Sequence, residues 1–283
     1  MRITVAGDIS APEFHQCCSY TNEAALVLQT DVDIKALLEI DWEAYVVRKQ
    51  QQDGGQYYKH TARYVVLVDG AYTGVQSDLQ ALLQARFPQH TIERIPQDWQ
   101  AAARHALKAA VRNPLVYMDV DVGGKPQRVV FELYSDVCPR ACENFRRLCT
   151  SRRAGQTYLG TPFHRVVPGG WVQGGDVAGG AGDRGSCALD NCASGTFEDE
   201  TFDVKFDAAG VLAMANAGPH TNASQFLVAL AQLPWLDRRA VAFGRVARGM
   251  RALRALEDVA TLNQRPLRDA RVVACGELAP EDL

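Results

Sequence analysis

The pattern of apolar residues changes at Leu115, and this change constrains the fold more than any other feature of the chain. After it, short apolar runs such as RVVFELY, VLAMANA and VAFGRV follow one another, with Gly, Pro, Asp and Asn between them. Short strands separated by turn residues are typical of an antiparallel barrel or sandwich rather than a parallel sheet. We therefore expect an all-β domain here, interrupted by a helix that begins at Cys138-Pro139 and another from about Met250 to Leu256.

The residues before Leu115 show a different pattern, in which strands alternate with helices. The expected order is strand, helix, strand, helix, strand, strand, helix, with a first strand at 3–8 and the first two helices at 14–28 and 41–52. The run YVVLVDGAYTG predicts a hairpin, because Asp69-Gly70 separates two strand-like segments. Ser77-Asp78 is expected to cap the next helix, and Pro88 to end it.

Between these two parts, the Ala-rich segment 98–111 has strong helix propensity. Asp98 is a suitable N-cap, and Asn113-Pro114 closes the helix. We interpret the segment as a helical linker that packs against a domain through the apolar side formed by Trp99, Ala103, Ala106 and Ala110. The predicted organisation is a first domain at 1–88, a linker at 89–114, a second domain at 115–278 and a tail at 279–283.

Composition and charge exclude several classes of protein. The chain has 283 residues and a formal net charge of −3, which implies no general attraction to nucleic acid. No apolar run approaches the roughly 18 residues that a membrane helix needs. The first residues form a strand-like alternation instead of the apolar region of a signal peptide. We therefore expect a cytoplasmic protein with neither a nucleic-acid nor a membrane partner.

Eight cysteines are present, and their spacing does not favour a metal site. Cys138/Cys142 and Cys187/Cys192 are the pairs closest to a ligand spacing, but zinc sites need tighter pairs or histidines at matching offsets. We predict no metal and interpret most of the cysteines as buried thiols. Cys187 and Cys192 lie in a Gly/Ser-rich loop and are the better candidates for a disulfide.

The segment FHRVVPGGWVQGGD, from Phe163 to Asp176, contains no nucleophile. With VVFELYSDVCPRACENFRRLC, GTFEDETF, GVLAMANAGPHTNASQFLVAL, PWLDRRAVAFGRVARGM and VACGEL, it makes residues 115–278 resemble the cyclophilin family of peptidyl-prolyl cis-trans isomerases. These strings occur in the family's order and spacing. The resemblance implies an eight-stranded antiparallel β-barrel capped by two helices. It also implies proline-containing peptides or proteins as partners, and no cofactor.

The chemistry of such a site follows from the X–Pro bond. Its barrier of ~18–20 kcal/mol comes from amide resonance, so a catalyst needs an apolar pocket for the ring and donors that favour the twisted state. By resemblance, Arg165 is the catalytic donor and Gln173 hydrogen-bonds the substrate backbone. Ala215 and Asn216 would contact the residue before proline, and Gln225 would support the groove. The other implied binding residues are Trp171, Leu227, Trp235 and Leu236, whereas Met214 is interpreted as core.

Four positions depart from the cyclophilin pattern. Gly170 and Leu227 stand where phenylalanines are usual, Ala240 replaces a histidine, and Trp171 stands where a pocket methionine is common. Losing two rings weakens the proline pocket unless Trp171 fills the gap. The sequence favours an isomerase of reduced activity. The alternative is a barrel that kept its core motifs after losing catalysis, because a fold does not prove a function.

The first domain resembles a thioredoxin/glutaredoxin-like module, mainly through VVLVDGAYTGVQSDLQALL at 65–83. In that alignment, APEF at 11–14 replaces the redox C-P-x-C, and Thr61-Ala62-Arg63 lacks the usual cis-proline. Without a thiolate there, disulfide exchange cannot run. We expect a degenerate, non-catalytic adaptor. Two alternatives stay open: a generic α/β likeness, and glutathione binding without catalysis.

The combination of the two domains, with GWVQGGD and LDRRAVAFG in the second, resembles the isomerase-like protein six branch of the cyclophilin family. That branch lacks several standard catalytic residues and is associated with ciliated cells. The resemblance implies a place in a cilium or flagellum. The alternative function is therefore a weak or inactive scaffold with neighbouring proteins of an axonemal microtubule assembly as its partners.

Overall fold

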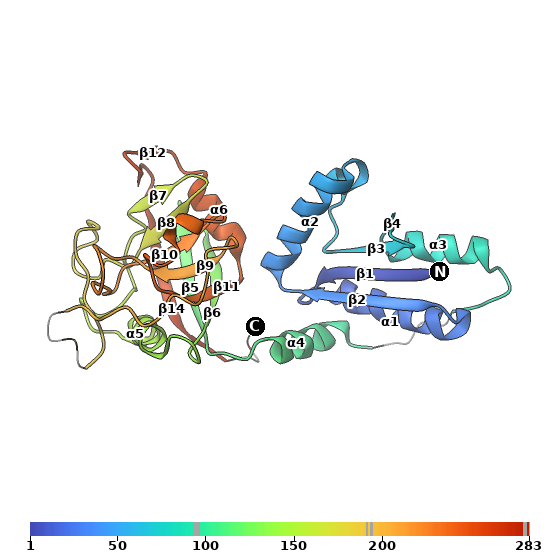
Figure 1. Cartoon of the computed structure of the whole chain (residues 1–283), viewed down its shortest axis with the longest axis horizontal. Helices are drawn as coiled ribbons and strands as arrows, with labels where there is room; N and C mark the ends of the chain where they lie inside the picture. The colour runs from blue at the N-terminus through green and yellow to red at the C-terminus, as the bar shows by residue number, and fades with distance from the viewer. Residues whose placement is uncertain (93–96, 191, 193–194, 280–281, 283) are drawn as a thin grey trace. The chain divides into compact units, whose positions relative to one another are not determined.

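The computed structural model describes residues 1–92, 97–190, 192, 195–279 and 282. The chain divides into two compact units, residues 1–111 and 112–282, which are described separately (Figure 1). Residues 93–96 of the predicted linker, and 280, 281 and 283 of the predicted tail, lie outside the described residues. None of the described helices is long and apolar enough to cross a membrane.

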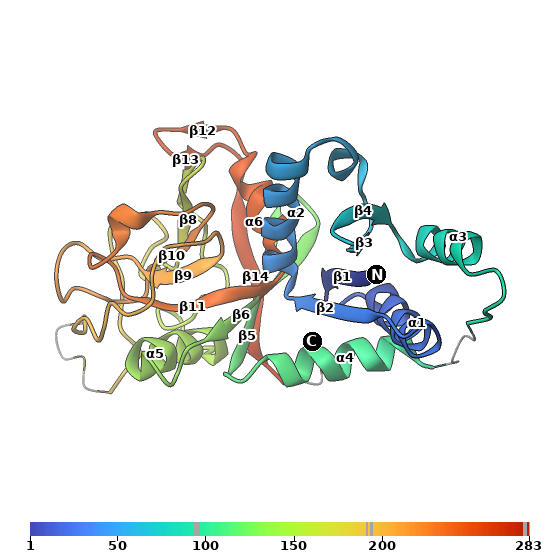
Figure 2. The same ribbon diagram turned by 45° about the vertical axis from the view of Figure 1, so that its right-hand side comes forward.

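The first unit is built on a four-stranded sheet in the order β2-β1-β3-β4 (Figure 2). Its strands are β1 (Arg2–Asp8), β2 (Asp31–Leu37), β3 (Tyr64–Val68) and β4 (Ala71–Gly74). β1 runs parallel to β2 and antiparallel to β3. Asp69 and Gly70 join β3 to β4 with φ angles of 51° and 83°, as a type I′ turn requires. The predicted hairpin is confirmed.

Helices cover both faces of this sheet. On one face, α1 (Pro12–Leu28) and α3 (Gln76–Arg86) enclose a core that includes Phe14, Val66 and Leu79. On the other, α2 (Glu39–Asp53) and the short 3₁₀ helix η1 (Gly55–Lys59) pack Trp42 and Tyr57 against the strands. α4 (Trp99–Ala110), which lies inside the predicted helical segment 98–111 of the linker, packs against α1 within this unit.

Two local predictions on these helices need correction. α3 begins at Gln76, and the Asp78 carboxylate accepts a hydrogen bond of 2.8 Å from the Val75 backbone, so Asp78 acts from inside the first turn. In α4, Asp98 caps the helix as predicted, with 3.0 Å between its Oδ1 and the Ala101 nitrogen. The buried face, however, carries Ala103 and Leu107, which lie one helical turn apart, and Leu107 packs with Ile9 and Leu38, whereas Ala110 is exposed.

The second unit contains an eight-stranded sheet in the order β14-β5-β6-β11-β9-β10-β8-β7. The strands are β5 (Leu115–Val122), β6 (Pro126–Leu133), β7 (Arg165–Val167), β8 (Trp171–Gly174), β9 (Val211–Met214), β10 (Phe226–Ala229), β11 (Ala242–Arg248) and β14 (Ala270–Leu278). All neighbouring pairs are antiparallel. The eight-stranded antiparallel sheet inferred from the family resemblance is confirmed.

The sheet is curled, and backbone hydrogen bonds join the segment just before β7 to β14, the strand at the opposite edge. The nitrogen of Phe163, just before β7, donates to the carbonyl of Ala270 at 2.8 Å, and Val272 of β14 donates to Thr161 at 3.0 Å. The predicted helices are present as α5 (Pro139–Thr150) and α6 (Met250–Glu257), which pack against the sheet at different ends (Figures 1 and 2).

The disulfide prediction is also confirmed, because Cys187 and Cys192 form an S–S bond. The other six cysteines are buried free thiols. Burial raises the pKa of the Cys17 thiol to about 12 and that of Cys138 to about 12. Such thiols are protonated at neutral pH and act as small apolar side chains.

A buried carboxylate anchors the end of β1. Asp8 is fully buried, and its Oδ1 accepts hydrogen bonds of 2.8 Å from both the nitrogen and the hydroxyl of Ser10. Arg63, just before β3, pairs with its other oxygen and also reaches the Ser10 hydroxyl. The Arg63 guanidinium therefore balances the negative charge of the Asp8 carboxylate, which is shielded from water.

Replacing Arg63 with Met is expected to destabilise the first unit by about 2–3 kcal/mol, because Asp8 would keep its Ser10 bonds but lose its counter-ion. Hydrogen exchange of the buried β1 and β3 amides measures this free energy. The control is Arg2→Met, which breaks the exposed Arg2–Asp33 pair and should cost less than about 0.5 kcal/mol. Equal effects from the two variants would contradict the role given to Arg63.

Candidate functional site

The predicted catalytic pair lies in one row that crosses neighbouring strands. Arg165 of β7 stands opposite Gln173 of β8, which stands opposite Leu227 of β10, which stands opposite Ala213 of β9. Directly opposed residues of a sheet project from the same face, and residues two apart along a strand share it as well. Trp171 therefore joins this face, and the row places two side chains with N–H donors beside an apolar surface.

Arg165 is exposed, and two contacts orient its guanidinium. Its Nε donates to Oε1 of Gln264 at 2.7 Å. The guanidinium carbon lies 5.1 Å from the centroid of the Trp171 ring, within the range of a cation–π contact. Among the described residues, no carboxylate pairs with Arg165, so its terminal Nη groups keep their donors.

A chain of amide hydrogen bonds holds the second donor. Nε2 of Gln173 donates to Oε1 of Gln225 at 2.9 Å, and Nε2 of Gln225 donates to the carbonyl of Arg184 at 2.7 Å. The Trp171 indole N–H approaches Oε1 of Gln173 at 3.4 Å. Because an amide nitrogen carries two hydrogens, Gln173 retains one donor. Gln225 thus acts here as a support for Gln173.

The loop that supplies the Arg184 carbonyl is organised by a buried carboxylate. Asp176 is 1% exposed and accepts hydrogen bonds from the nitrogens of Ala178 at 2.9 Å and Gly182 at 2.7 Å. Burial alone would raise the pKa of Asp176, but N–H groups of the loop, including those of Gly180 and Arg184, outweigh it and hold this pKa below its usual value. The loop geometry therefore depends on an ionised Asp176.

An apolar cluster adjoins the donors. Leu227 and Ala240 are buried in it, and Trp171 and Leu236 pack against it from the outside. Its remaining buried members are Phe206, Val211, Ala213, Ala229, Leu233 and Ala242. At Gly170, an added Cβ would lie 3.0 Å from Cγ1 of Val167, so a larger residue there requires Val167 to move. The partly buried ring of Trp171 packs against this cluster.

The other predicted binding residues lie close in sequence to side chains of this cluster. The Ala215 nitrogen donates to the Gln225 carbonyl at 2.9 Å, and Nδ2 of Asn216 donates to the Arg239 carbonyl at 2.7 Å. Trp235 lies in the short helix η2 (Pro234–Leu236) and is 56% exposed. The roles of these residues toward a ligand stay predictions. Met214 is fully buried.

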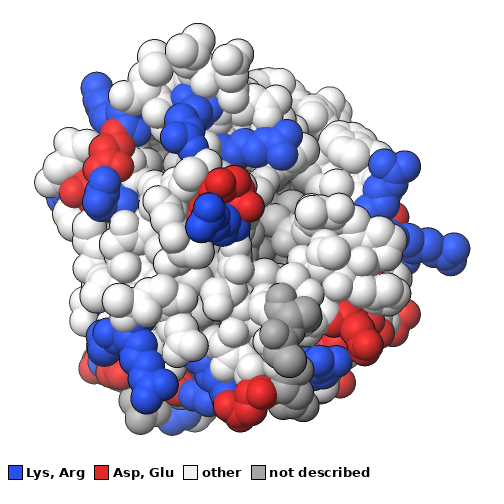
Figure 3. Space-filling model, turned by 90° about the vertical axis from the view of Figure 1, so that its left-hand side faces the viewer, with Lys and Arg blue, Asp and Glu red and all other residues white. Residues whose placement is uncertain are grey.

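The surface of the second unit is mixed in charge. On the side shown in Figure 3, uncharged side chains cover much of the area, and basic and acidic residues form small mixed groups. The Arg147–Asp190 pair, at 3.1 Å, and the Arg140–Glu198 pair, at 3.7 Å, are examples of such local compensation in this unit. The described residues on this side therefore present no broad field of a single sign.

Sequence reasoning did not find Gln264 or the Arg184 carbonyl. Gln264 is 99 residues from Arg165, and nothing in the local pattern signals their contact. The structure places Gln264 in a turn in which Asn263 and Gln264 adopt φ angles of 50° and 65°. Backbone carbonyls such as that of Arg184 carry no sequence signal at all.

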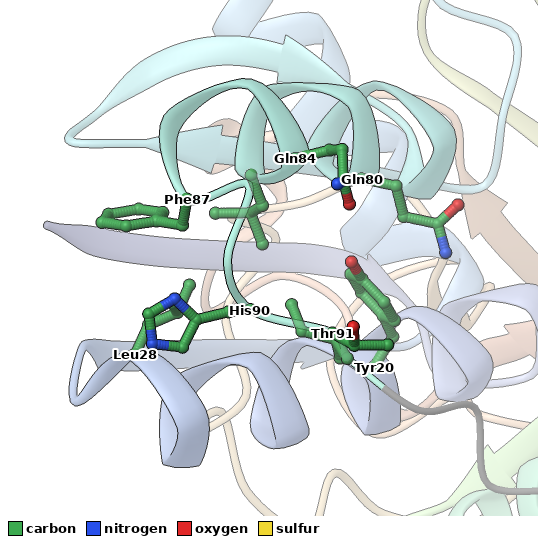
Figure 4. A pocket seen from close by; sticks show the side chains of 9 residues that line it. Tyr20, Leu28, Gln80, Gln84, Phe87, His90 and Thr91 are labelled. Carbon is green, nitrogen blue, oxygen red and sulfur yellow. The ribbon is translucent and has the colours of Figure 1, made fainter.

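A separate cavity lies in the first unit between α1 and α3 (Figure 4). Its volume is about 200 Å³, and its lining mixes polar and apolar side chains: Tyr20, Leu28, Gln80, Leu83, Gln84, Phe87, His90, Thr91 and Ile92. None of the predicted site residues lines it, and no cysteine or carboxylate is among these residues. Among the described residues that line it, no thiol is available for redox chemistry.

Comparison with known proteins shows which protein family the second unit matches. The family model described as cyclophilin type peptidyl-prolyl cis-trans isomerase/CLD matches residues 117–277. A human protein named "Probable inactive peptidyl-prolyl cis-trans isomerase-like 6" is 32% identical, over 98% of this chain and 92% of its own length. Proteins of the same name from cattle and mouse are 34% and 35% identical, over 85% and 88% of this chain and 80% and 81% of their own lengths.

Replacing Asp176 with Asn is expected to lower the stability of the second unit at pH 7 by about 1–3 kcal/mol, because charged acceptors bind N–H groups more strongly. The folded pKa of Asp176 lies below its usual value, so its contribution is complete above about pH 4 and is lost as the pH falls through the folded pKa. Urea unfolding at pH 7 and pH 3 should show the difference shrinking at the lower pH.

Asp183→Asn is the matched control for this prediction, because its carboxylate lies in the same loop and is 67% exposed. It should leave stability nearly unchanged at both pH values. A difference between wild type and Asp176→Asn that grows toward pH 3 would contradict the sign argued above.

Proposed function

The chain belongs to the cyclophilin-type peptidyl-prolyl cis-trans isomerase family, and from that premise we propose that its second unit binds proline-containing peptides and isomerises X–Pro bonds slowly. The observation that carries this proposal is the state of Arg165. Its Nε donates to Gln264 and its flat face lies over the Trp171 ring, while no hydrogen bond within the described part of the chain engages its Nη groups beside the apolar cluster. A fixed, permanently charged donor next to a surface for a proline ring is what the reaction requires.

The mechanism needs no nucleophile and no cofactor. As the X–Pro bond twists, the proline nitrogen regains its lone pair, and an Nη–H of Arg165 donates to it, which stabilises the twisted state over either planar isomer. The free N–H of Gln173 binds the substrate backbone beside it. Ala215 and Asn216 line the path of the residue before proline. Trp235 and Leu236 form the outer wall.

Reduced activity follows from the pocket. Trp171 packs against the cluster of Leu227 and Ala240, where the proline ring would be buried, and burying a ring is the main source of affinity in such a site. A ligand must displace the indole or bind beside it. The relatives named "Probable inactive" are consistent with a weak enzyme.

We further propose that the curled sheet of the second unit forms a β-barrel. Its edges are joined by hydrogen bonds of segment 161–163 to β14. One face of such a barrel encloses the aromatic core, and the other carries the groove.

For the first unit we propose a second function, that of a binding adaptor. In this proposal, residues 1–88 form a degenerate thioredoxin-like domain. At the start of α1, the segment 11–14 carries no thiol. Further along that helix, Cys17 and Cys18 are buried, and burial raises the pKa of each thiol. These features support a binding role instead of disulfide exchange, with glutathione binding as the alternative for this unit.

With an adaptor in the first unit and a restricted pocket in the second, the protein as a whole can serve as a scaffold. We place it in the cytoplasm, in a cilium or flagellum, with axonemal neighbours as partners. That placement rests on the resemblance to the isomerase-like protein six branch.

The isomerase proposal predicts that the wild type accelerates cis–trans exchange of an Ala-Pro peptide, measured by exchange NMR. Arg165→Ala should lower the catalysed rate about 100-fold or to the uncatalysed background, because it removes the charged donor. Arg271→Ala is the control, since Arg271 pairs with Asp269 on the surface. If wild type and Arg165→Ala both match the rate without protein, the isomerase proposal fails and the scaffold remains.

Trp171→Met is expected to tighten binding of the same peptide about tenfold, because a flexible side chain leaves the cluster open to a proline ring. The measurement is the Kd from an NMR titration. Trp235→Met, at the exposed tryptophan of the outer wall, is the matched control and should weaken binding. An unchanged or weaker affinity of Trp171→Met would show that the indole is a platform for the ligand.

A further inference from the structure

We propose that Gln264 is a positioning residue for Arg165, which it orients through the guanidinium Nε while leaving the Nη donors to the ligand. This inference rests on the proposed function of the second unit and deepens it. Gln264 lies in the turn between β12 (Thr261–Leu262) and β13 (Arg265–Pro266), a two-stranded hairpin outside the main sheet.

Two contacts fix Gln264 beside Arg165. Its backbone carbonyl accepts a hydrogen bond of 2.7 Å from the nitrogen of Val166, the next residue of β7. Its side-chain Oε1 accepts the Nε–H of Arg165 at 2.7 Å. The backbone contact places the turn, and the side-chain amide oxygen then accepts a hydrogen bond from the neighbouring arginine. The two contacts are separable, because a change of side chain leaves the carbonyl in place.

The choice of a neutral acceptor matters for the chemistry. A guanidinium has five N–H donors, and the bond to Gln264 uses the one on Nε. The Trp171 ring engages the flat face at 5.1 Å, and no carboxylate of the described residues pairs with Arg165. A carboxylate would take two donors in a bidentate pair and offset the charge. An amide fixes the orientation and leaves the full positive charge facing the groove.

The hairpin of β12 and β13 also contacts the loop that supports Gln173, the second N–H donor of the site. Arg265 donates through Nη2 to the Ala181 carbonyl, in the loop that Asp176 organises. That loop supplies the Arg184 carbonyl, which holds Gln225 and through it Gln173. One surface hairpin therefore braces both groups that the reaction uses, and Gln264 is its contact with the catalytic arginine.

The test compares Gln264→Ala with Asn263→Ala in the full chain. Both positions have positive φ and lie in the same turn, so the two alanines carry similar backbone strain, and the side-chain hydrogen bond to Arg165 belongs to Gln264. The first readout is the Arg165 Nε–H signal in ¹⁵N-resolved NMR. Its exchange with water should accelerate about fivefold in Gln264→Ala and stay unchanged in Asn263→Ala.

The second readout is the isomerisation of the Ala-Pro peptide. Gln264→Ala should lower kcat about threefold to fivefold and change KM less than about twofold, because orientation matters most in the twisted state. Gln264→Glu keeps an acceptor for Nε and should restore the Nε–H protection. In the Arg165→Lys background, Gln264→Ala should have no further effect, as expected for two residues that act through one contact.

The inference is overturned if Gln264→Ala and Asn263→Ala give the same Nε–H exchange, or if Gln264→Ala lowers kcat equally in the Arg165→Lys background. Failure of the proposed function gives a different result: the wild type neither binds nor turns over the peptide. In that case the Nε–H signal still decides whether Gln264 orients Arg165.

Discussion

The second unit depends on the packing of Phe145 against four other aromatic rings. Phe145 projects from α5, and its ring lies 5.0–5.9 Å from those of Phe131, Tyr158, Phe226 and Phe243, counted between centroids. These partners come from β6, the segment before β7, β10 and β11. One ring therefore links α5 to three strands of the curled sheet and to the segment before β7. Because side chains alternate along a strand, burying Phe226 inside forces Leu227 onto the opposite face, where it joins the groove.

The features that the sequence predicts best are those decided within a few residues. Asp69-Gly70 specifies its turn, and Asp98 caps its helix, because both effects are local. The family motifs likewise predict that Arg165 and Gln173 share one site. Asp78 was misplaced at the cap because the start of α3 depends on where β4 ends, which involves pairing with β3. The contact of Gln264 with Arg165 depends on a hairpin 99 residues away, and no local pattern encodes it.

The site combines hydrogen-bond donors that are already oriented with an apolar surface that is partly covered. Its donors are oriented by internal hydrogen bonds, such as Gln173 to Gln225 and Gln225 to Arg184. Because these side chains are already ordered, ligand binding costs less of their conformational entropy. The apolar part is occupied by Trp171, which lowers the area left for a proline ring. The hydrogen-bond donors of the site are thus oriented for a peptide, whereas Trp171 reduces the apolar area available to it. From this combination we expect slow turnover.

The turn at Asn263 and Gln264 adds a physical reason to regard the hairpin as functional. Both residues adopt left-handed backbone angles, which cost a residue other than glycine roughly 1–2 kcal/mol relative to its preferred conformation. Asparagine tolerates this region better than glutamine does, and glycine would satisfy the second position without strain. A glycine could still offer the carbonyl that Val166 binds, but it has no amide for Nε of Arg165. The strained glutamine is therefore explained by its side chain, and backbone strain of this kind is concentrated at functional sites.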